Sequence, residues 1–152
     1  MPYCVGHWAC LAPTGAFIAV TQTIDPSIIL LSLAVIGWVS GFDIIYSLQD
    51  EASDSTEGLS SIPAKLGKKN ALLVSRLLHA STILLIFSSG YLFGLHWIFA
   101  LGAALFSGLL IYQQSIVKAD DLSRVNIAFM TANGIASIAF ALLTIADLII
   151  LN

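Results

Sequence analysis

Four long apolar runs restrict this sequence to folds that a lipid bilayer can accommodate. A helix needs about 20 predominantly apolar residues to cross the hydrocarbon core of a membrane. Residues 27–46, 77–95, 97–117 and 126–151 meet this length, and the second run can be extended back to Ala71. Residues 3–23 form a weaker fifth candidate, because Pro13 and Gly15 would kink a helix there.

Composition agrees with a membrane protein. Of 152 residues, 58% are apolar and only 10% are charged, whereas a soluble domain usually carries about 25% charged residues. Mean hydropathy is +0.93, so there is too little polar sequence to cover a soluble core. We therefore predict an all-α polytopic transmembrane bundle with four to five spans, formed as a single transmembrane domain by residues 1–152. No basic patch indicates nucleic-acid binding.

The basic residues predict the orientation of the bundle. The longest polar segment is residues 47–70, predicted to be a loop, and a shorter one follows residue 117. The two spans between them would form a hairpin, so both segments would lie on one side of the membrane. That side would carry all six basic residues, Lys65, Lys68, Lys69, Arg76, Lys118 and Arg124. The positive-inside rule makes it cytoplasmic, and we expect a bacterial inner (plasma) membrane protein.

Three aspartates are spaced seven and four residues apart, starting near the end of the first apolar run. Asp43, Asp50 and Asp54 would lie within roughly 40° of one another if one helix continued through them, with Tyr46 at the edge of the same face. A charge inside a membrane helix costs about 2.5–3.5 kcal/mol. Mg²⁺ characteristically pairs one or two carboxylates with substrate phosphates. The row therefore indicates a Mg²⁺-diphosphate site, and a solvated helix end is the alternative.

The same segment resembles a known motif. Its pattern, Asp43-x-x-Tyr46-x-x-x-Asp50-x-x-x-Asp54, is similar to the second aspartate-rich motif of the UbiA superfamily of intramembrane prenyltransferases. Further segments resemble the 4-hydroxybenzoate polyprenyltransferase branch, and the resemblance covers essentially the whole chain. These segments are Leu11-Ala-Pro-x-Gly-Ala16, Gly58-Leu-Ser-Ser-Ile-Pro-Ala-Lys-Leu-Gly67, Ile111-Tyr-Gln-Gln114 and Ala128-Phe-Met-x-x-Asn133.

The resemblance implies an activity in quinone biosynthesis. Such enzymes transfer a polyprenyl group from its diphosphate to an aromatic acceptor, with Mg²⁺ stabilising the charge on the leaving group. By this match Asp43, Asp50 and Asp54 would bind the metal, and Tyr46 would line the wall between metal and cavity.

Three further polar residues are candidates for substrate binding. Lys65 and Arg76 could contact the diphosphate, although anchoring at the lipid headgroups is an open alternative for both. Asn133 could bind the aromatic acceptor, or it could hold helices together by hydrogen bonds together with Gln113 and Gln114.

The chain also departs from the family pattern. Members of the superfamily have about nine spans and a first motif of the form Asn-Asp-x-x-Asp-x-x-x-Asp, and no asparagine here is followed by aspartate. The match corresponds to the C-terminal half, the second half of a nine-helix fold. A fragment, one product of a split gene and a truncated gene all remain open. We expect the chain alone to be inactive and a separately encoded N-terminal half to be a possible partner.

Two other functions remain as alternatives: a cation-binding membrane transporter subunit, and a non-catalytic membrane helical fragment. A transporter should carry ionisable groups near the bilayer midplane, whereas they gather near one membrane face here.

The sequence also gives expectations for Asp147 and for the glycines of the predicted spans. Asp147 should lie close enough to the outer interface to be solvated. Five glycines should allow close helix packing, namely Gly90, Gly94, Gly102, Gly108 and Gly134.

Overall fold

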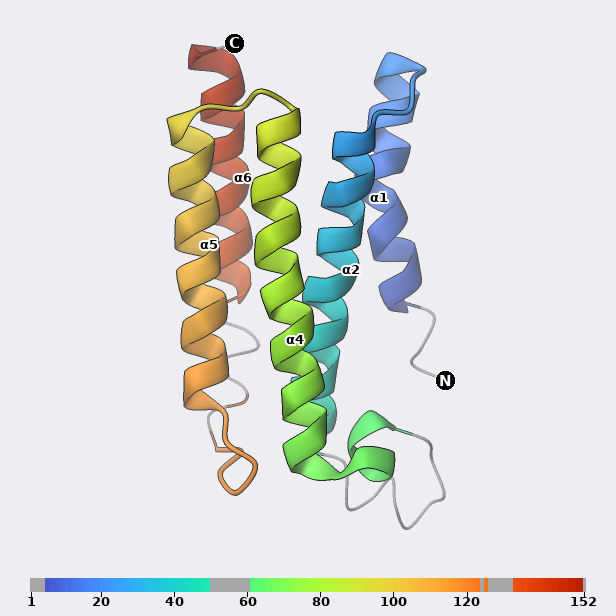
Figure 1. Cartoon of the computed structure of the whole chain (residues 1–152), viewed down its shortest axis with the longest axis vertical. Coiled ribbons are helices and arrows are strands. Elements are labelled where there is room, and N and C mark those ends of the chain that lie inside the picture. Colours follow the sequence, from blue (N-terminus) through green and yellow to red (C-terminus); the bar gives the residue numbers. More distant parts are fainter. Residues whose placement is uncertain (1–4, 50–60, 124, 126–132, 152) are drawn as a thin grey trace.

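The computed structural model describes residues 5–49, 61–123, 125 and 133–151, with side chains from residue 11 onward. In these ranges the chain is helical apart from short connections and one isolated bridge between Lys118 and Asp121. The helices, labelled as in Figure 1, are α1 (Val5–Thr21), α2 (Pro26–Ser47), α4 (Ile62–Leu92), α5 (Trp97–Ile116) and α6 (Asn133–Ile150).

Four of these helices, α2, α4, α5 and α6, are long and apolar enough to cross a membrane. The predicted all-α polytopic bundle is therefore confirmed, and the bounds of α2 and α5 differ from the predicted spans by one residue at most. Helix α1 has 17 residues and contains Pro13.

Local sequence explains where two helices begin. Asp25 caps α2 by accepting a hydrogen bond from the Ser27 backbone N–H at 2.8 Å, and Pro26 occupies the first turn, where its missing N–H costs nothing. Ser61 caps α4 in the same way through the Ala64 N–H at 3.3 Å. Helix α4 thus begins inside the segment predicted to be a loop.

A sharp turn divides the first part of α4 from the rest. Gly67 has φ 74° and ψ 158°, a backbone conformation that is essentially restricted to glycine. In Figure 1 the short helical turn before Gly67 lies across the end of the bundle, and the rest of α4 runs along it.

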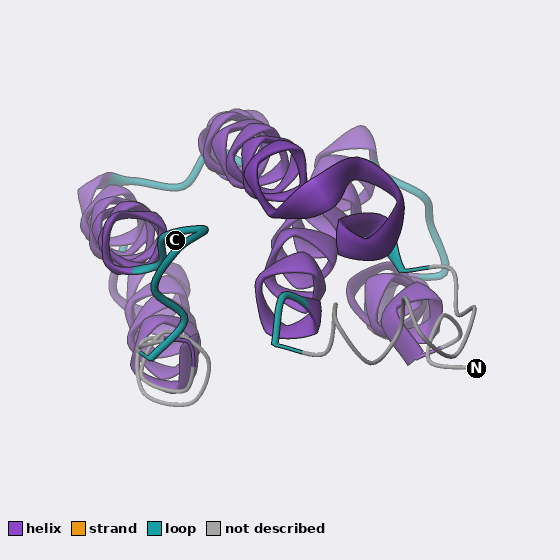
Figure 2. Cartoon of the chain, turned by 90° about the horizontal axis from the view of Figure 1, so that it is seen from below, coloured by secondary structure: helices purple, strands orange, loops and turns teal. Residues whose placement is uncertain are grey.

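The helices pack in chain order and form an open arc (Figure 2). Helix α1 packs on α2, α2 on α4, α4 on α5 and α5 on α6. The connections that leave α2 and α5 lie at one end of the bundle, and the α1–α2 and α4–α5 turns lie at the other (Figure 1). The first of these ends is called the basic end, because Lys65, Lys68, Lys69 and Lys118 lie there. The predicted hairpin arrangement is therefore present.

Helices α2 and α4 approach closely along two glycines that the sequence reasoning did not single out. A Cβ at Gly37 would lie 2.7 Å from Oγ1 of Thr82, and one at Gly41 would lie 2.6 Å from Nε2 of His79. Both distances are far inside van der Waals contact, so only glycine fits at these positions. Small residues of this kind let two helix backbones approach in a membrane.

The expectation for the other glycines is only partly correct. A Cβ added at Gly90 would lie 2.6 Å from Cζ of the Phe99 ring, and one added at Gly102 would lie 3.0 Å from Cβ of Leu143. Gly94 instead has φ 70° and forms the α4–α5 turn. Gly108 and Gly134 have no neighbouring atom within 4 Å of an added Cβ, because their helix faces meet no other described element.

Asp147 corrects another expectation. It was expected to be solvated, yet its relative exposure is 0%. Its carboxylate accepts hydrogen bonds from the backbone N–H groups of His96 at 2.9 Å and Phe99 at 3.0 Å. Asp147 of α6 therefore caps the N-terminus of α5, where the side chain of His96 itself makes no capping bond. The favourable field at a helix N-terminus explains how a buried carboxylate is tolerated here.

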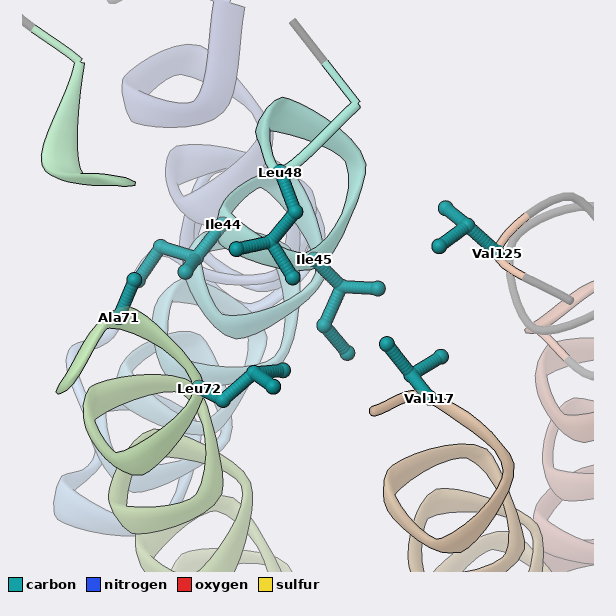
Figure 3. Packing of buried hydrophobic residues seen from close by; sticks show 7 residues of the cluster. All are labelled: Ile44, Ile45, Leu48, Ala71, Leu72, Val117 and Val125. Carbon is teal, nitrogen blue, oxygen red and sulfur yellow. The ribbon is translucent and has the colours of Figure 1, made fainter. Parts of the chain in front are cut away.

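A cluster of buried apolar side chains holds the basic end together (Figure 3). It joins the last turns of α2 to α4 and to the residues that follow α5. Its members are Ile44, Ile45, Leu48, Ala71, Leu72, Val117 and Val125. This packing fixes the end of α2 from which the predicted site residues project.

Candidate functional site

Asp43 and Tyr46 lie in the last two turns of α2, at the basic end. Asp43 is two residues beyond Gly41, so it lies about 160° around the helix from the face that packs on α4. Its side chain is exposed, and Tyr46 is 44% exposed. An exposed carboxylate beside a phenol on one helix end is available to a ligand that approaches from outside the α2–α4 pair.

The other two predicted metal ligands, Asp50 and Asp54, lie outside the described residues. Helix α2 ends at Ser47, with Leu48 as its C-cap, so in the described part the helical row contains Asp43 and Tyr46 alone. Residues 11–49, 61–123, 125 and 133–151 contain no group of three His, Cys, Asp or Glu side chains that could hold a metal ion. The donor set predicted for Mg²⁺ combines Asp43 with the two undescribed carboxylates, and oxygen donors of this kind fit that ion.

Lys65 lies in the short helical turn before Gly67, and its side chain is exposed at the basic end. Lys68 and Lys69 follow directly after the turn. The sequence predicted a phosphate contact from Lys65, and its position at the same end of the bundle as Asp43 is compatible with that role.

A buried hydrogen-bond network joins α2, α4 and α5, one to two helical turns farther into the bundle than Tyr46. Ser75 donates to the Gly41 carbonyl at 2.6 Å, and His79 Nε2 lies 3.3 Å from the Trp38 carbonyl. Gln114 Nε2 lies 2.8 Å from Ser75 Oγ and 2.9 Å from His79 Nδ1. His79 is only 2% exposed. The partners of His79 on α2 and α5 show that it fixes the packing of three helices.

Asn133 occupies the junction of α2, α5 and α6. Its Oδ1 accepts hydrogen bonds from Trp38 Nε1 at 3.2 Å and Gln113 Nε2 at 3.0 Å. The sequence left a choice between substrate binding and interhelical hydrogen bonding, and these bonds show that Asn133 does hold helices together. Its buried Nδ2 has no hydrogen-bond partner among the described residues.

An apolar cavity of about 200 Å³ lies next to this junction, between α2, α4, α5 and α6. Trp38 stacks edge-on against Phe106 at 5.2 Å between ring centroids, and both rings line the cavity. Its other walls include Ala34, Thr82 and Phe140. Small-molecule sites usually enclose about 300–1,000 Å³, so this cavity is large enough for only part of a substrate.

Arg76 lies on α4 directly after Ser75, with an exposed side chain. It lines a second hollow, between α4 and α5, together with His79 and Gln114. The sequence left a choice for Arg76 between a diphosphate contact and anchoring at the headgroups. The structure places it on α4, whereas Asp43 projects from the side of α2 that faces away from α4.

Comparison with known proteins assigns the family. The profile of the UbiA prenyltransferase family matches residues 3–143. The chain is 30% identical over 125 residues to the 4-hydroxybenzoate octaprenyltransferase of Nitrosococcus oceani, covering 82% of this chain and 44% of that protein. The proteins of the same name from Citrobacter koseri and Serratia proteamaculans are 27% and 30% identical, each over 82% of this chain and 43% of theirs.

This chain thus spans less than half the length of the curated relatives that it matches. No solved structure matches it. The helical membrane bundle, the aspartate and tyrosine at the end of α2 and the profile match over residues 3–143 lead to one conclusion, that this chain belongs to the UbiA prenyltransferase family.

Proposed function

We propose that this chain supplies one half of a prenyltransferase that moves a polyprenyl group from its diphosphate to an aromatic acceptor of the 4-hydroxybenzoate type, in quinone biosynthesis. The observation that carries the proposal is the family match over residues 3–143 together with the exposed Asp43 and Tyr46 at the end of a membrane helix. The relatives' shared name supplies the acceptor.

In this proposal Asp43, Asp50 and Asp54 bind Mg²⁺ and, through it, the diphosphate. The ion would stabilise negative charge on the leaving group. Tyr46, three residues after Asp43, would line the passage from the metal to the cavity. Lys65 would contact a phosphate oxygen from the same end of the bundle. A charged site at the membrane surface beside an apolar interior suits a substrate with a diphosphate head and a hydrocarbon tail.

The apolar cavity and Asn133 are the proposed acceptor end. Asn133 Nδ2, which has no hydrogen-bond partner in the described part of the chain, lies beside a cavity walled by Trp38 and Phe106. An aromatic ring would pack against those rings, and an amide donor could orient its polar substituent. Because the cavity is small, the rest of the substrate site would come from an N-terminal half, which would also complete the metal site. We therefore expect the chain alone to have no prenyltransferase activity.

The proposal can be tested in a chimera that joins the N-terminal half of the Nitrosococcus oceani enzyme to this chain. The chimera should prenylate 4-hydroxybenzoate in membranes supplied with octaprenyl diphosphate and Mg²⁺, and this chain alone should not. Asp43→Asn should lower kcat at least 100-fold, because a ligand to the charge-stabilising metal is lost. Asp120→Asn changes an exposed acid at the same end and should leave the rate unchanged.

Two outcomes would contradict the proposal. Turnover by this chain alone would show that no other half is needed. Equal rates for the Asp43→Asn chimera and the unchanged chimera would remove Asp43 from the site. A transporter subunit would instead bind or move cations without any prenyl transfer in the chimera, and Mg²⁺-dependent product formation distinguishes the two.

A further inference from the structure

The contact between α4 and α5 is close at one end of the bundle and hollow toward the other. At the end with the α4–α5 turn, the Phe99 ring fills the space over Gly90. Toward the basic end the two helices separate around two hollows, the central cavity and a groove of about 180 Å³. Beyond this close contact, α4 and α5 are joined by the Gln114 hydrogen bonds to Ser75 and His79, with hollows beside them.

The groove lies on the opposite side of this contact from the central cavity. The cavity is lined from four helices, whereas the groove is lined from α4 and α5 alone. On α4, Ala80 of the groove lies about 160° around the helix from Thr82 of the cavity. On α5, Ile111 lies about 140° from Phe106. Ala80 is exposed, and Ile111 is 62% exposed, so the groove opens on the outside of the arc, toward lipid.

The walls of the groove change character along its length. Ala80, Leu110 and Ile111 make it apolar, and Arg76 and Gln114 lie toward the basic end. Among the described residues Arg76 forms no ion pair or hydrogen bond. The Oε1 atom of Gln114 is buried and has no hydrogen-bond partner in the same ranges. Within the described ranges the groove therefore presents the Arg76 guanidinium, with no acidic partner in those ranges, above an apolar slot.

A cation at the membrane surface with an apolar slot beneath it matches one kind of ligand. A phospholipid places a phosphate at the headgroup level and an acyl chain below it. Basic pockets between membrane helices near one membrane surface bind anionic headgroups, and Arg presents a planar fork of donors that fits a phosphate. We propose that the α4–α5 groove is a binding site for an anionic phospholipid, with its phosphate on Arg76 and an acyl chain along Ala80 and Ile111.

Such a lipid would fill the hollow on the outer side of the α4–α5 contact and would add to the Gln114 hydrogen bonds that join the two helices there. The proposal does not depend on the reaction, because Asp43, the described member of the proposed metal site, does not line the groove. It assigns Arg76 to the lipid headgroup, whereas the sequence reasoning had also considered the diphosphate for it. Lys118 lies at the same end, but its connection also carries Asp120 and Asp121, so Arg76 is the charge on which recognition should depend.

The test measures lipid binding by the full chain purified in detergent, using native mass spectrometry with phosphatidylglycerol and phosphatidylcholine. We expect phosphatidylglycerol to bind about five-fold more tightly, the effect of one basic residue near the surface. Arg76→Gln should remove this preference. Lys69→Gln is the matched control, since Lys69 is exposed on the same helix and end but lies outside the groove; it should keep the preference.

A second pair of variants tests the apolar part of the groove. Ala80→Trp should fill the slot and weaken binding of both lipids, whereas Leu84→Trp, one turn along α4 and 71% exposed, should not. The proposal would be overturned if wild type showed no preference, or if Lys69→Gln removed the preference as fully as Arg76→Gln. Displacement of the phospholipid by soluble glycerol phosphate would also overturn the proposal. Loss of lipid binding when an N-terminal half is joined to the chain would overturn it too, because the groove would then be covered by protein.

Discussion

At the scale of single residues, the bundle depends on positions where only the smallest side chain fits. Gly41 is the clearest example. An added Cβ would meet Nε2 of His79 at 2.6 Å and the Ser75 carbonyl oxygen at 3.2 Å. His79 cannot move aside without losing its contacts with the Trp38 carbonyl and with Gln114. The tight approach and the polar network are therefore parts of one arrangement.

Gly41→Ala should accordingly destabilise the fold. We expect a loss of about 1–3 kcal/mol in the free energy of unfolding, the usual cost of overpacking. Gly108→Ala is the matched control, because nothing lies within 4 Å of an added Cβ there, and it should change the free energy by less than about 1 kcal/mol. Unfolding of both variants in mixed micelles, followed by circular dichroism, gives the comparison. Equal stability of the two variants would contradict this account.

Asp25 gives a prediction about pH. Hydrogen bonds from the Ser27 hydroxyl and backbone N–H lower the pKa of the Asp25 carboxyl below its usual value. A carboxyl with a depressed pKa stabilises the fold above its unfolded pKa of about 3.9, and that contribution is lost as the pH falls through the folded pKa.

The measurement is the thermal midpoint of wild type and of Asp25→Asn between pH 6 and pH 3. The asparagine variant keeps a capping acceptor but cannot titrate, so its midpoint should fall less than that of wild type across this range. Parallel curves would show that the Asp25 cap does not contribute to the acid sensitivity.

At the scale of helices, the α5–α6 hairpin is closed by a side chain from the far end of the sequence. Asp147 caps α5 through the His96 and Phe99 N–H groups. Asp147→Ala should leave these buried donors unpaired, lower the thermal midpoint, and increase proteolysis at the α4–α5 turn. Asp120→Ala, at an exposed acid in the α5–α6 connection, should do neither. An unchanged midpoint in Asp147→Ala would show that the cap adds nothing to stability.

The same scale shows what sequence could and could not predict. The existence of the four spans and the bounds of α2 and α5 followed from the apolar runs, because a bilayer imposes its thickness on every span. The start of α4 did not, since it lies in the polar segment predicted to be a loop. The role of Asp147 did not follow, since its partners lie 48 and 51 residues away. Gly37 and Gly41 were missed for the same reason, because the face of α2 that meets α4 is decided by packing.

The candidate site was predictable to a similar degree. Asp43 and Tyr46 project from the end of α2, where the motif placed them. The rest of the row stays a prediction, because α2 ends at Ser47 and Asp50 and Asp54 lie outside the described residues. The hydrogen bond from Trp38 to Asn133 could not be predicted, because the two residues lie 95 positions apart in the sequence and no local sequence pattern relates them.

At the scale of the whole molecule, the distribution of charge predicts an orientation that can be measured. The basic residues described by the structure lie toward the end at which α2 and α5 finish, while the α1–α2 and α4–α5 turns lie at the opposite end (Figure 1). From the positive-inside rule we predict that the basic end, and with it Asp43, faces the cytoplasm. Under the proposed function, this orientation decides which pool of prenyl diphosphate the site can use, because a charged diphosphate does not cross a bilayer freely.

Single cysteines test this orientation directly. In a background with Cys4→Ser and Cys10→Ser, Ile24→Cys lies in the α1–α2 turn and Asp120→Cys in the α5–α6 connection, and both positions are exposed. A membrane-impermeant maleimide added to intact bacterial cells should label position 24 and leave position 120 unlabelled, and permeabilised cells should show both labelled. The reverse pattern would place the carboxylates outside the cell, and labelling of both positions in intact cells would mean that the chain alone lacks a fixed orientation.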